Sequence, residues 1–142
     1  MTTQTEEKVR IEFDVPLKKV RDLLVTAFEG GSNYWMRYSN CKYPEHLKNE
    51  VVRSIDDLEN YYPLSVMCVT TPDCSIDIHE FNDVGEITDT HKGVNMQTIK
   101  KGLSAYATKC PQGFSDFING DTDITTADTL LQIALFGEVI YG

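Results

Sequence analysis

An amphipathic stretch near the start of the chain runs directly into two glycines. Its apolar residues recur at the spacing of one buried helical face. They are Leu17, Val20, Leu24, Ala27 and Phe28. Pro16 suits the first turn of a helix, and either Gly30 or Gly31 can adopt the left-handed conformation that closes one. We therefore predict a helix from Pro16 to this glycine pair, packed on a core through one face.

Strands are predicted on both sides of this helix. Residues 8–13 and 75–81 alternate between polar and apolar side chains, which is typical of half-buried strands. Residues 64–71 are rich in β-formers and are separated from 75–81 by a turn-forming Pro-Asp pair, so we expect these two segments to form a hairpin. Residues 86–88 are a candidate for a further short element, and residues 32–49 show no convincing period.

The second half of the chain is predicted to be mainly helical. Asn95 is a suitable N-cap for a helix that runs to about Lys109, and residues 114–118 suggest one further helical turn. Gly102 lies inside the first of these helices, where a glycine costs about 1 kcal/mol relative to alanine. A glycine is tolerable at this position if another backbone packs close to it.

The last helix, which ends before Gly137, is apolar on most of its circumference and should be largely buried. Thr125 or Thr126 is its expected N-cap, with Asp128 in the first turn, where the helix dipole favours an acid. Gln132 interrupts the apolar surface, and a buried amide needs hydrogen-bond partners. We therefore predict a structural role for Gln132, in which it bonds the Gly-Gly-Ser-Asn backbone after the first helix.

These elements predict a single α+β domain. A chain of 142 residues has the size of one domain and needs no disulfide or metal to fold. We expect a mainly antiparallel three- to four-stranded sheet with about three helices packed on it. The domain is predicted over 8–142, after a disordered or frayed start at 1–7. The chain has neither a long apolar run nor a signal-peptide pattern, which favours a cytoplasmic protein without membrane contact.

The net charge of −9 lies in the middle of the chain. Residues 50–90 hold ten acids and one base, Arg53, whereas the charges of the two ends cancel. A field of this sign repels phosphates, so direct nucleic-acid binding is disfavoured. The simplest interpretation is a solvated acidic face. An alternative is a DNA-mimic inhibitor that binds a basic host protein through Asp56, Asp57 and Glu59.

The segment after the glycine pair is the strongest candidate for a ligand site. Glycines allow close backbone approach, the next two residues offer hydrogen bonds, and an adjacent tyrosine and tryptophan offer flat faces for a purine. Two arginines would bind a phosphate bidentately. The predicted set is Gly30, Gly31, Ser32, Asn33, Tyr34, Trp35, Arg37 and Arg53. We expect Trp35→Ala and Asn33→Ala to abolish binding and leave the fold intact. The alternative is a helix end followed by aromatic residues that close the edge of the core.

Common catalytic motifs are absent from the sequence. It contains no glycine-rich phosphate loop, no Gly-x-Ser-x-Gly and no His-Glu-x-x-His. Asp77 and His79 share one face of a predicted strand beside Glu80, so a small hydrolase is a further alternative, weighed against plain solvated polar residues. No metal or cofactor is predicted. The chain is therefore more simply interpreted as a binding protein than as an enzyme.

Two segments resemble parts of small bacteriophage accessory proteins. One runs from Leu23 to Trp35 and ends in Glu-Gly-Gly-Ser-Asn-Tyr-Trp; the other runs from Ala127 to Gly142 and ends in Ala-Leu-Phe-Gly-Glu-Val-Ile-Tyr-Gly. The resemblance implies a phage-encoded protein in the cytoplasm of the host cell, with no catalytic residue to carry over. By analogy with similar-sized phage proteins, it implies a counter-defence role in which a nucleotide-like ligand is sequestered, often by an oligomer.

Overall fold

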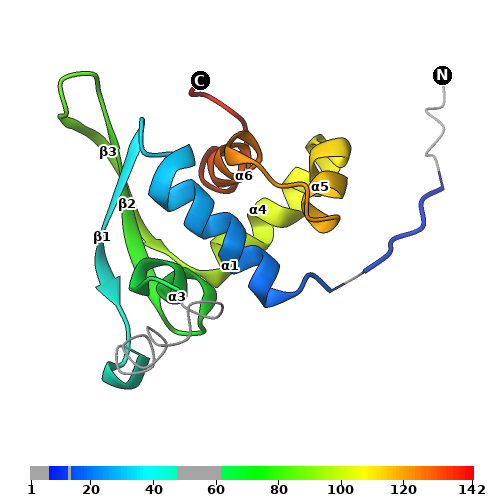
Figure 1. The fold of residues 1–142 in the computed structure, drawn as a ribbon, viewed down its shortest axis with the longest axis horizontal. Coiled ribbons are helices and arrows are strands. Elements are labelled where there is room, and N and C mark those ends of the chain that lie inside the picture. Colours follow the sequence, from blue (N-terminus) through cyan, green and yellow to red (C-terminus); the bar gives the residue numbers. More distant parts are fainter. Residues whose placement is uncertain (1–6, 13, 48–61) are drawn as a thin grey trace, which may run out of the picture.

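The computed structural model describes residues 7–12, 14–47 and 62–142 (Figure 1). Its three strands form one antiparallel sheet in the order β1-β2-β3. They are β1 (Met36–Lys42), β2 (Ser75–Phe81) and β3 (Ile87–Val94). The helices lie to one side of this sheet. The predicted α+β class and the mainly antiparallel sheet are therefore confirmed.

The helices outnumber the three that the sequence predicts. They are α1 (Leu17–Thr26), its π-helical continuation η1 (Ala27–Gly31), α3 (Leu64–Thr70), α4 (Met96–Lys109), α5 (Pro111–Ile118) and α6 (Ile124–Phe136), and residues 45–47 are helical as well. Helix α6 packs against α4, η1 and α1, and four of its apolar side chains are buried, as predicted. None of the helices in the described parts of the chain has the length and apolar character needed to cross a bilayer.

The strand predicted over residues 8–13 is wrong for the part that the structure describes. Residues 7–12 pair with no strand and lie away from the body of the fold (Figure 1). Val9 and Ile11, the residues expected to face the core, are 90% and 80% exposed. Alternation shows that a segment is able to form a half-buried strand, but a strand also needs a partner, and both neighbours of β2 are already other segments.

The hairpin predicted from residues 64–71 and 75–81 is also wrong, because the first segment is helix α3. Its β-branched residues pack in the core. The hydroxyl of Thr70 donates a hydrogen bond to the carbonyl of Val66, 2.7 Å away. Strand β2 pairs instead with β1 and with β3, which is longer than the expected element at 86–88. Beta propensity is strongly context-dependent, and here tertiary packing decides the conformation.

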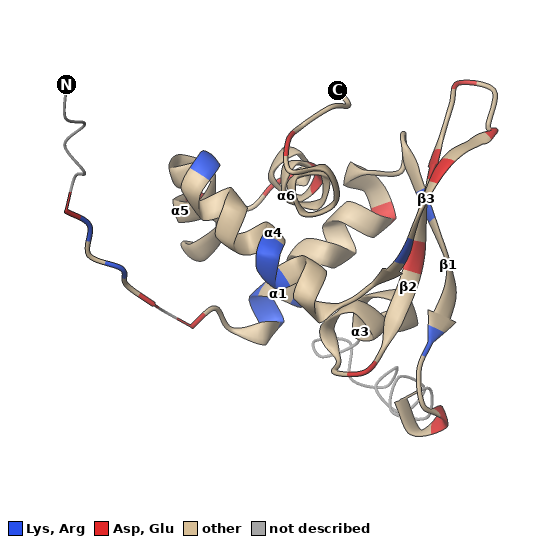
Figure 2. Ribbon diagram, turned by 180° about the vertical axis from the view of Figure 1, so that it is seen from behind, with Lys and Arg blue, Asp and Glu red and all other residues tan. Residues whose placement is uncertain are grey.

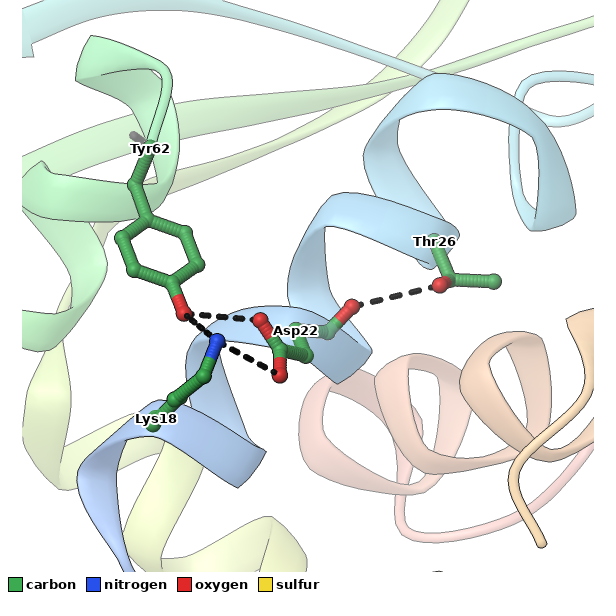
Figure 3. Close-up of polar contacts among 4 residues, drawn as sticks. All are labelled: Lys18, Asp22, Thr26 and Tyr62. Carbon is green, nitrogen blue, oxygen red and sulfur yellow. Dashed lines mark hydrogen bonds and ion pairs between the residues drawn. The ribbon is translucent and has the colours of Figure 1, made fainter. Parts of the chain in front are cut away.

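A polar cluster fixes the chain before α3 to α1 (Figure 3). The hydroxyl of Tyr62 donates to Asp22 Oδ1 at 2.7 Å and accepts from Lys18 Nζ at 3.2 Å. Tyr62 is itself buried, and burial together with the hydrogen bond to Asp22 raises the pKa of its phenol. Thr26 extends the cluster by donating to the Asp22 carbonyl at 3.2 Å. These contacts position α3 beside α1.

Gly102 allows α4 and α6 to approach closely. A Cβ atom at this position would lie 2.5 Å from Cβ and 2.9 Å from Cα of Ala134 on α6. The second of these atoms belongs to the backbone and cannot rotate away. Another backbone therefore does pack against this glycine, as the sequence requires for a glycine inside the helix.

We expect Gly102→Ala to lower the free energy of unfolding by about 2 kcal/mol, because overpacking costs more than the gain in helix propensity. Chemical denaturation measures the change. Gly102→Ala combined with Ala134→Gly should recover part of the loss, since the second substitution removes the clashing methyl group. Ser104→Ala, at an exposed position of the same helix, is the control. A Gly102→Ala protein as stable as the wild type would contradict the close approach of α4 and α6.

Candidate ligand-binding site

A cleft of about 600 Å³ opens beside the first turns of α6. Gly30 and Gly31 at the end of η1 line it together with Tyr34 of the loop that follows. The segment after α6 lines it from the other side. The predicted candidate segment therefore contributes three lining residues. The lining also includes Asp128 of α6, whose part in the site the sequence did not predict.

Asp128 is the centre of the hydrogen bonds around this cleft. Its Oδ1 accepts from the hydroxyl of Ser32 at 2.9 Å and from the indole N–H of Trp35 at 2.7 Å. Its Oδ2 accepts from the hydroxyl of Tyr34 at 2.5 Å and from the Gln132 amide at 3.1 Å. One half-buried carboxylate thus holds the loop after η1 against α6. Partial burial and the hydrogen bond to Asp128 raise the pKa of Tyr34 to about 12, so its phenol remains a donor.

Helix α6 begins earlier in the sequence than predicted, which changes the position of Asp128 within it. The N-cap is Asp123, whose side chain accepts from the backbone N–H of Thr126 at 2.8 Å, and not Thr125 or Thr126. The helix therefore begins earlier than expected, and Asp128 lies beyond its first turn. The prediction that Asp128 lies in the first turn is therefore wrong, and its carboxylate bonds the loop after η1.

Gln132 is fully buried and has hydrogen-bond partners, as predicted, but its backbone partners belong to the segment after α6 and not to the glycine loop. Its Oε1 accepts from the backbone N–H groups of Ile140 and Tyr141, each at 2.8 Å. Its Nε2 donates to the Tyr141 carbonyl at 3.2 Å and to the Tyr34 hydroxyl at 3.3 Å. Gln132 therefore fixes the segment after α6 to the helix, and it contacts the predicted loop through a side chain and not through the Gly-Gly-Ser-Asn backbone.

Trp35 and Ser32 support the loop from behind and do not line the cleft. The indole of Trp35 is 1% exposed. The ring of Tyr141 stacks on it with centroids 5.1 Å apart and planes 7° apart, and Phe136 packs at 5.3 Å. Ser32 is completely buried. The predicted stacking of a ligand on Trp35 therefore has no exposed face to use in this arrangement, whereas Tyr34 is 50% exposed.

The glycine pair ends the helix by a different mechanism from the predicted one. Neither glycine adopts the left-handed conformation. The helix widens into the π turn η1, in which the N–H of Ser32 donates to the carbonyl of Ala27 at 2.9 Å. Gly31 is required by close packing, because a Cβ atom there would lie 2.9 Å from the Ile124 carbonyl oxygen. Gly30 faces open space in the cleft.

The predicted arginine pair is not assembled at the cleft within the part of the chain that the structure describes. Arg37 lies on β1 with its guanidinium 4.5 Å from the centre of the Phe81 ring, and Arg53 is outside the described residues. Asn33 is exposed but does not line the cleft. The acidic surface of the alternative hypothesis, Asp56, Asp57 and Glu59, is also outside the described residues and stays a prediction.

The polar residues of the hydrolase hypothesis have structural partners, and only two of the three share a face. The Asp77 carboxylate accepts from the Asn40 amide at 2.9 Å and the backbone N–H of Gly93 at 3.0 Å, which lowers its pKa. His79 bonds hydroxyl groups of the two flanking strands. Asp77 and His79 lie on one face of β2, as predicted, and Glu80 lies on the opposite face, as strand alternation requires. The geometry gives these three residues no common substrate position.

Comparisons of the chain with protein-family models, with curated proteins and with solved structures found no match. The site is therefore interpreted from its own residues.

Proposed function

We propose that this chain is a non-enzymatic binding protein that holds one end of a small nucleotide-like ligand in the cleft beside α6. The observation that carries the proposal is the meeting of the glycine loop, the start of α6 and the segment after it around one cavity. Its volume of about 600 Å³ is in the range of small-molecule sites. Asp128 and Gln132 hold the walls in place before a ligand arrives, which reduces the entropy cost of binding.

The chemistry of the lining favours the base or nucleoside end of such a ligand over its phosphates. Among the described residues around the cleft, none is lysine or arginine. Asp128 already accepts four hydrogen bonds, so its main remaining influence is a negative charge that disfavours anions. The half-exposed ring of Tyr34 offers a stacking face, and the lining residues Thr125 and Thr129 carry hydroxyl groups. We expect phosphates to point to solvent.

The biological setting that we propose is the blunting of a host immune signal by a phage-encoded protein. Its support is the resemblance of residues 23–35 and 127–142 to small phage proteins. Both segments meet at this cleft: the first supplies Gly30 and Tyr34, and the second supplies Asp128 and Tyr141. A resemblance confined to the two segments that build one site is consistent with a shared ligand.

Calorimetric titration with nucleosides, cyclic mononucleotides, cyclic dinucleotides and ADP-ribose tests the proposal. Gly30→Leu should weaken binding at least about tenfold, equivalent to about 1.4 kcal/mol, because the new side chain fills the cleft. It should leave stability nearly unchanged, since nothing lies within 4 Å of a Cβ atom at this position. Glu29→Leu, on the exposed neighbouring residue outside the lining, is the matched control.

Two results would count against this function. The first is that none of these compounds binds the wild-type protein. The second is that Gly30→Leu binds a ligand as tightly as Glu29→Leu does, which would place the ligand elsewhere. Tyr34→Phe separates the two roles of Tyr34, because it keeps the stacking ring and removes the hydroxyl that donates to Asp128.

A further inference from the structure

A second group of ionisable side chains lies across β2 and β3, two strands that carry acidic residues (red in Figure 2). None of its members lines the cleft, although the lining residue Tyr141 contacts one of them. Glu80, Asp89 and His91 each present one ligand atom, and these atoms lie within 4.8 Å of one another. Glu80 and Asp89 are direct partners in the strand pairing, so both carboxylates emerge on the same face of the sheet. His91 pairs with Ile78, the next inward-facing position of β2, and therefore shares that face.

The group is closed on one side and open on the other. Glu80 is only 7% exposed, whereas His91 is half-buried and Asp89 is exposed. The Nε2 atom of His91 lies 2.8 Å from Glu80 Oε2. A cation that enters from solvent would therefore meet Asp89 first and reach the buried carboxylate and the imidazole behind it.

The charges of the group call for a positive partner. Within residues 7–12, 14–47 and 62–142, no lysine or arginine forms an ion pair with Glu80 or Asp89. The buried carboxylate of Glu80 is bonded to His91 and Tyr141, but a neutral imidazole and a phenol leave its charge uncompensated. The nearby carboxylate of Asp89 adds like charge. The imidazole of His91 makes the group a mixed nitrogen and oxygen donor set, which differs from an ordinary acidic surface.

Two residues outside the group hold the side chains of Glu80 and His91 in place. The hydroxyl of Tyr141 donates a hydrogen bond to Glu80 Oε1, the oxygen that does not face His91. Phe136 packs edge-on against the His91 ring with centroids 5.3 Å apart. Outer contacts of this kind orient the ligands of metal sites and limit their rotation.

We infer that Glu80, Asp89 and His91 bind a divalent transition-metal cation, with Zn²⁺ the best match to two carboxylates and one imidazole. Zinc bonds these atoms at roughly 2.0–2.2 Å, so small side-chain rotations bring three atoms within 4.8 Å into one coordination sphere. Three protein ligands leave a fourth position for water or another molecule. The inference does not depend on the proposed ligand of the cleft.

Titration of tag-free protein with Zn²⁺, and with Co²⁺ followed by its visible absorption, tests this site. We expect one ion per chain and a Co²⁺ spectrum of low coordination number. Asp89→Asn and His91→Ala should each weaken Zn²⁺ binding roughly 100-fold or more, because loss of an outer contact alone costs 10–100-fold. Asp89 is exposed, so its substitution tests the site without disturbing the core.

His79→Ala is the matched control, because His79 lies on the same strand pair and faces the opposite side of the sheet. It should bind Zn²⁺ like the wild type. Wild-type protein that binds neither ion would overturn the inference, as would His79→Ala losing as much affinity as His91→Ala. The titration measures metal binding alone, so a protein that binds no metal would leave the nucleotide proposal unaffected. Equally, a protein that binds none of the nucleotides would leave the metal site unaffected.

Discussion

Trp35→Ala is expected to lower the free energy of unfolding by about 3–5 kcal/mol, the usual cost of deleting a buried large aromatic side chain. The indole is 1% exposed, stacks on Tyr141 and donates to Asp128. The substitution removes both contacts and leaves a cavity beneath the loop. Denaturant unfolding followed by circular dichroism measures the loss. This expectation replaces the one from sequence, in which Trp35→Ala leaves the fold intact.

Tyr38→Ala provides the comparison for this prediction. Tyr38 is an aromatic residue of β1, three positions after Trp35. It is 43% exposed and packs on Phe28 with ring centroids 5.6 Å apart. We expect a loss of about 1 kcal/mol, since much less of this ring leaves water on folding. If both substitutions cost the same, the deep burial of Trp35 would be refuted.

Asp128→Ala is expected to cost about 3 kcal/mol of stability. The change removes the acceptor of the Ser32 hydroxyl and the Trp35 N–H, both of which are buried. A buried donor left without a partner costs about 1–3 kcal/mol, so two such donors cost about 2–6 kcal/mol. Because Asp128 is only half-buried, water reaches the site after the substitution, and we expect a value in the lower half of this range. Thermal or denaturant unfolding measures the difference.

A double-mutant cycle with Trp35→Phe isolates the indole hydrogen bond to Asp128. Phenylalanine keeps an aromatic ring but lacks the N–H group, so removal of Asp128 should matter less in that background. We expect a coupling energy of about 1 kcal/mol or more. Asp121→Ala, at an exposed acid before α6, is the control for loss of charge. Additive effects of Trp35→Phe and Asp128→Ala would show that this bond contributes nothing measurable.

The sequence predicts helices better than strands in this chain, and the physical reason is locality. The helix that ends at Gly31 and the helix capped by Asn95 depend on periodicity and caps within a few residues, and both are present. Strands depend on partners that are distant in sequence. Residues 8–12 carry a strand pattern but have no strand partner among the residues that the structure describes, whereas β1 pairs with β2 despite having no clear alternation.

The candidate site can be predicted only in part from the sequence, for the same reason. Its loop is recognisable from local composition, because two glycines precede hydrogen-bonding and aromatic residues. The partner that organises the loop is not recognisable, because Asp128 lies more than 90 residues away from Ser32 and Trp35. The group of Glu80, Asp89 and His91 is also hidden, since bulges between β2 and β3 set which side chains share a face.

Trp35 is the single tryptophan of the chain, which gives the protein a built-in fluorescent reporter. Its emission comes from one indole that contacts both Asp128 of the cleft and the ring of Tyr141. Tyr141 in turn donates to Glu80. A ligand in the cleft and a cation on the sheet would therefore both change the emission of this indole. Titration of one in the presence of the other would measure the thermodynamic coupling between the two sites.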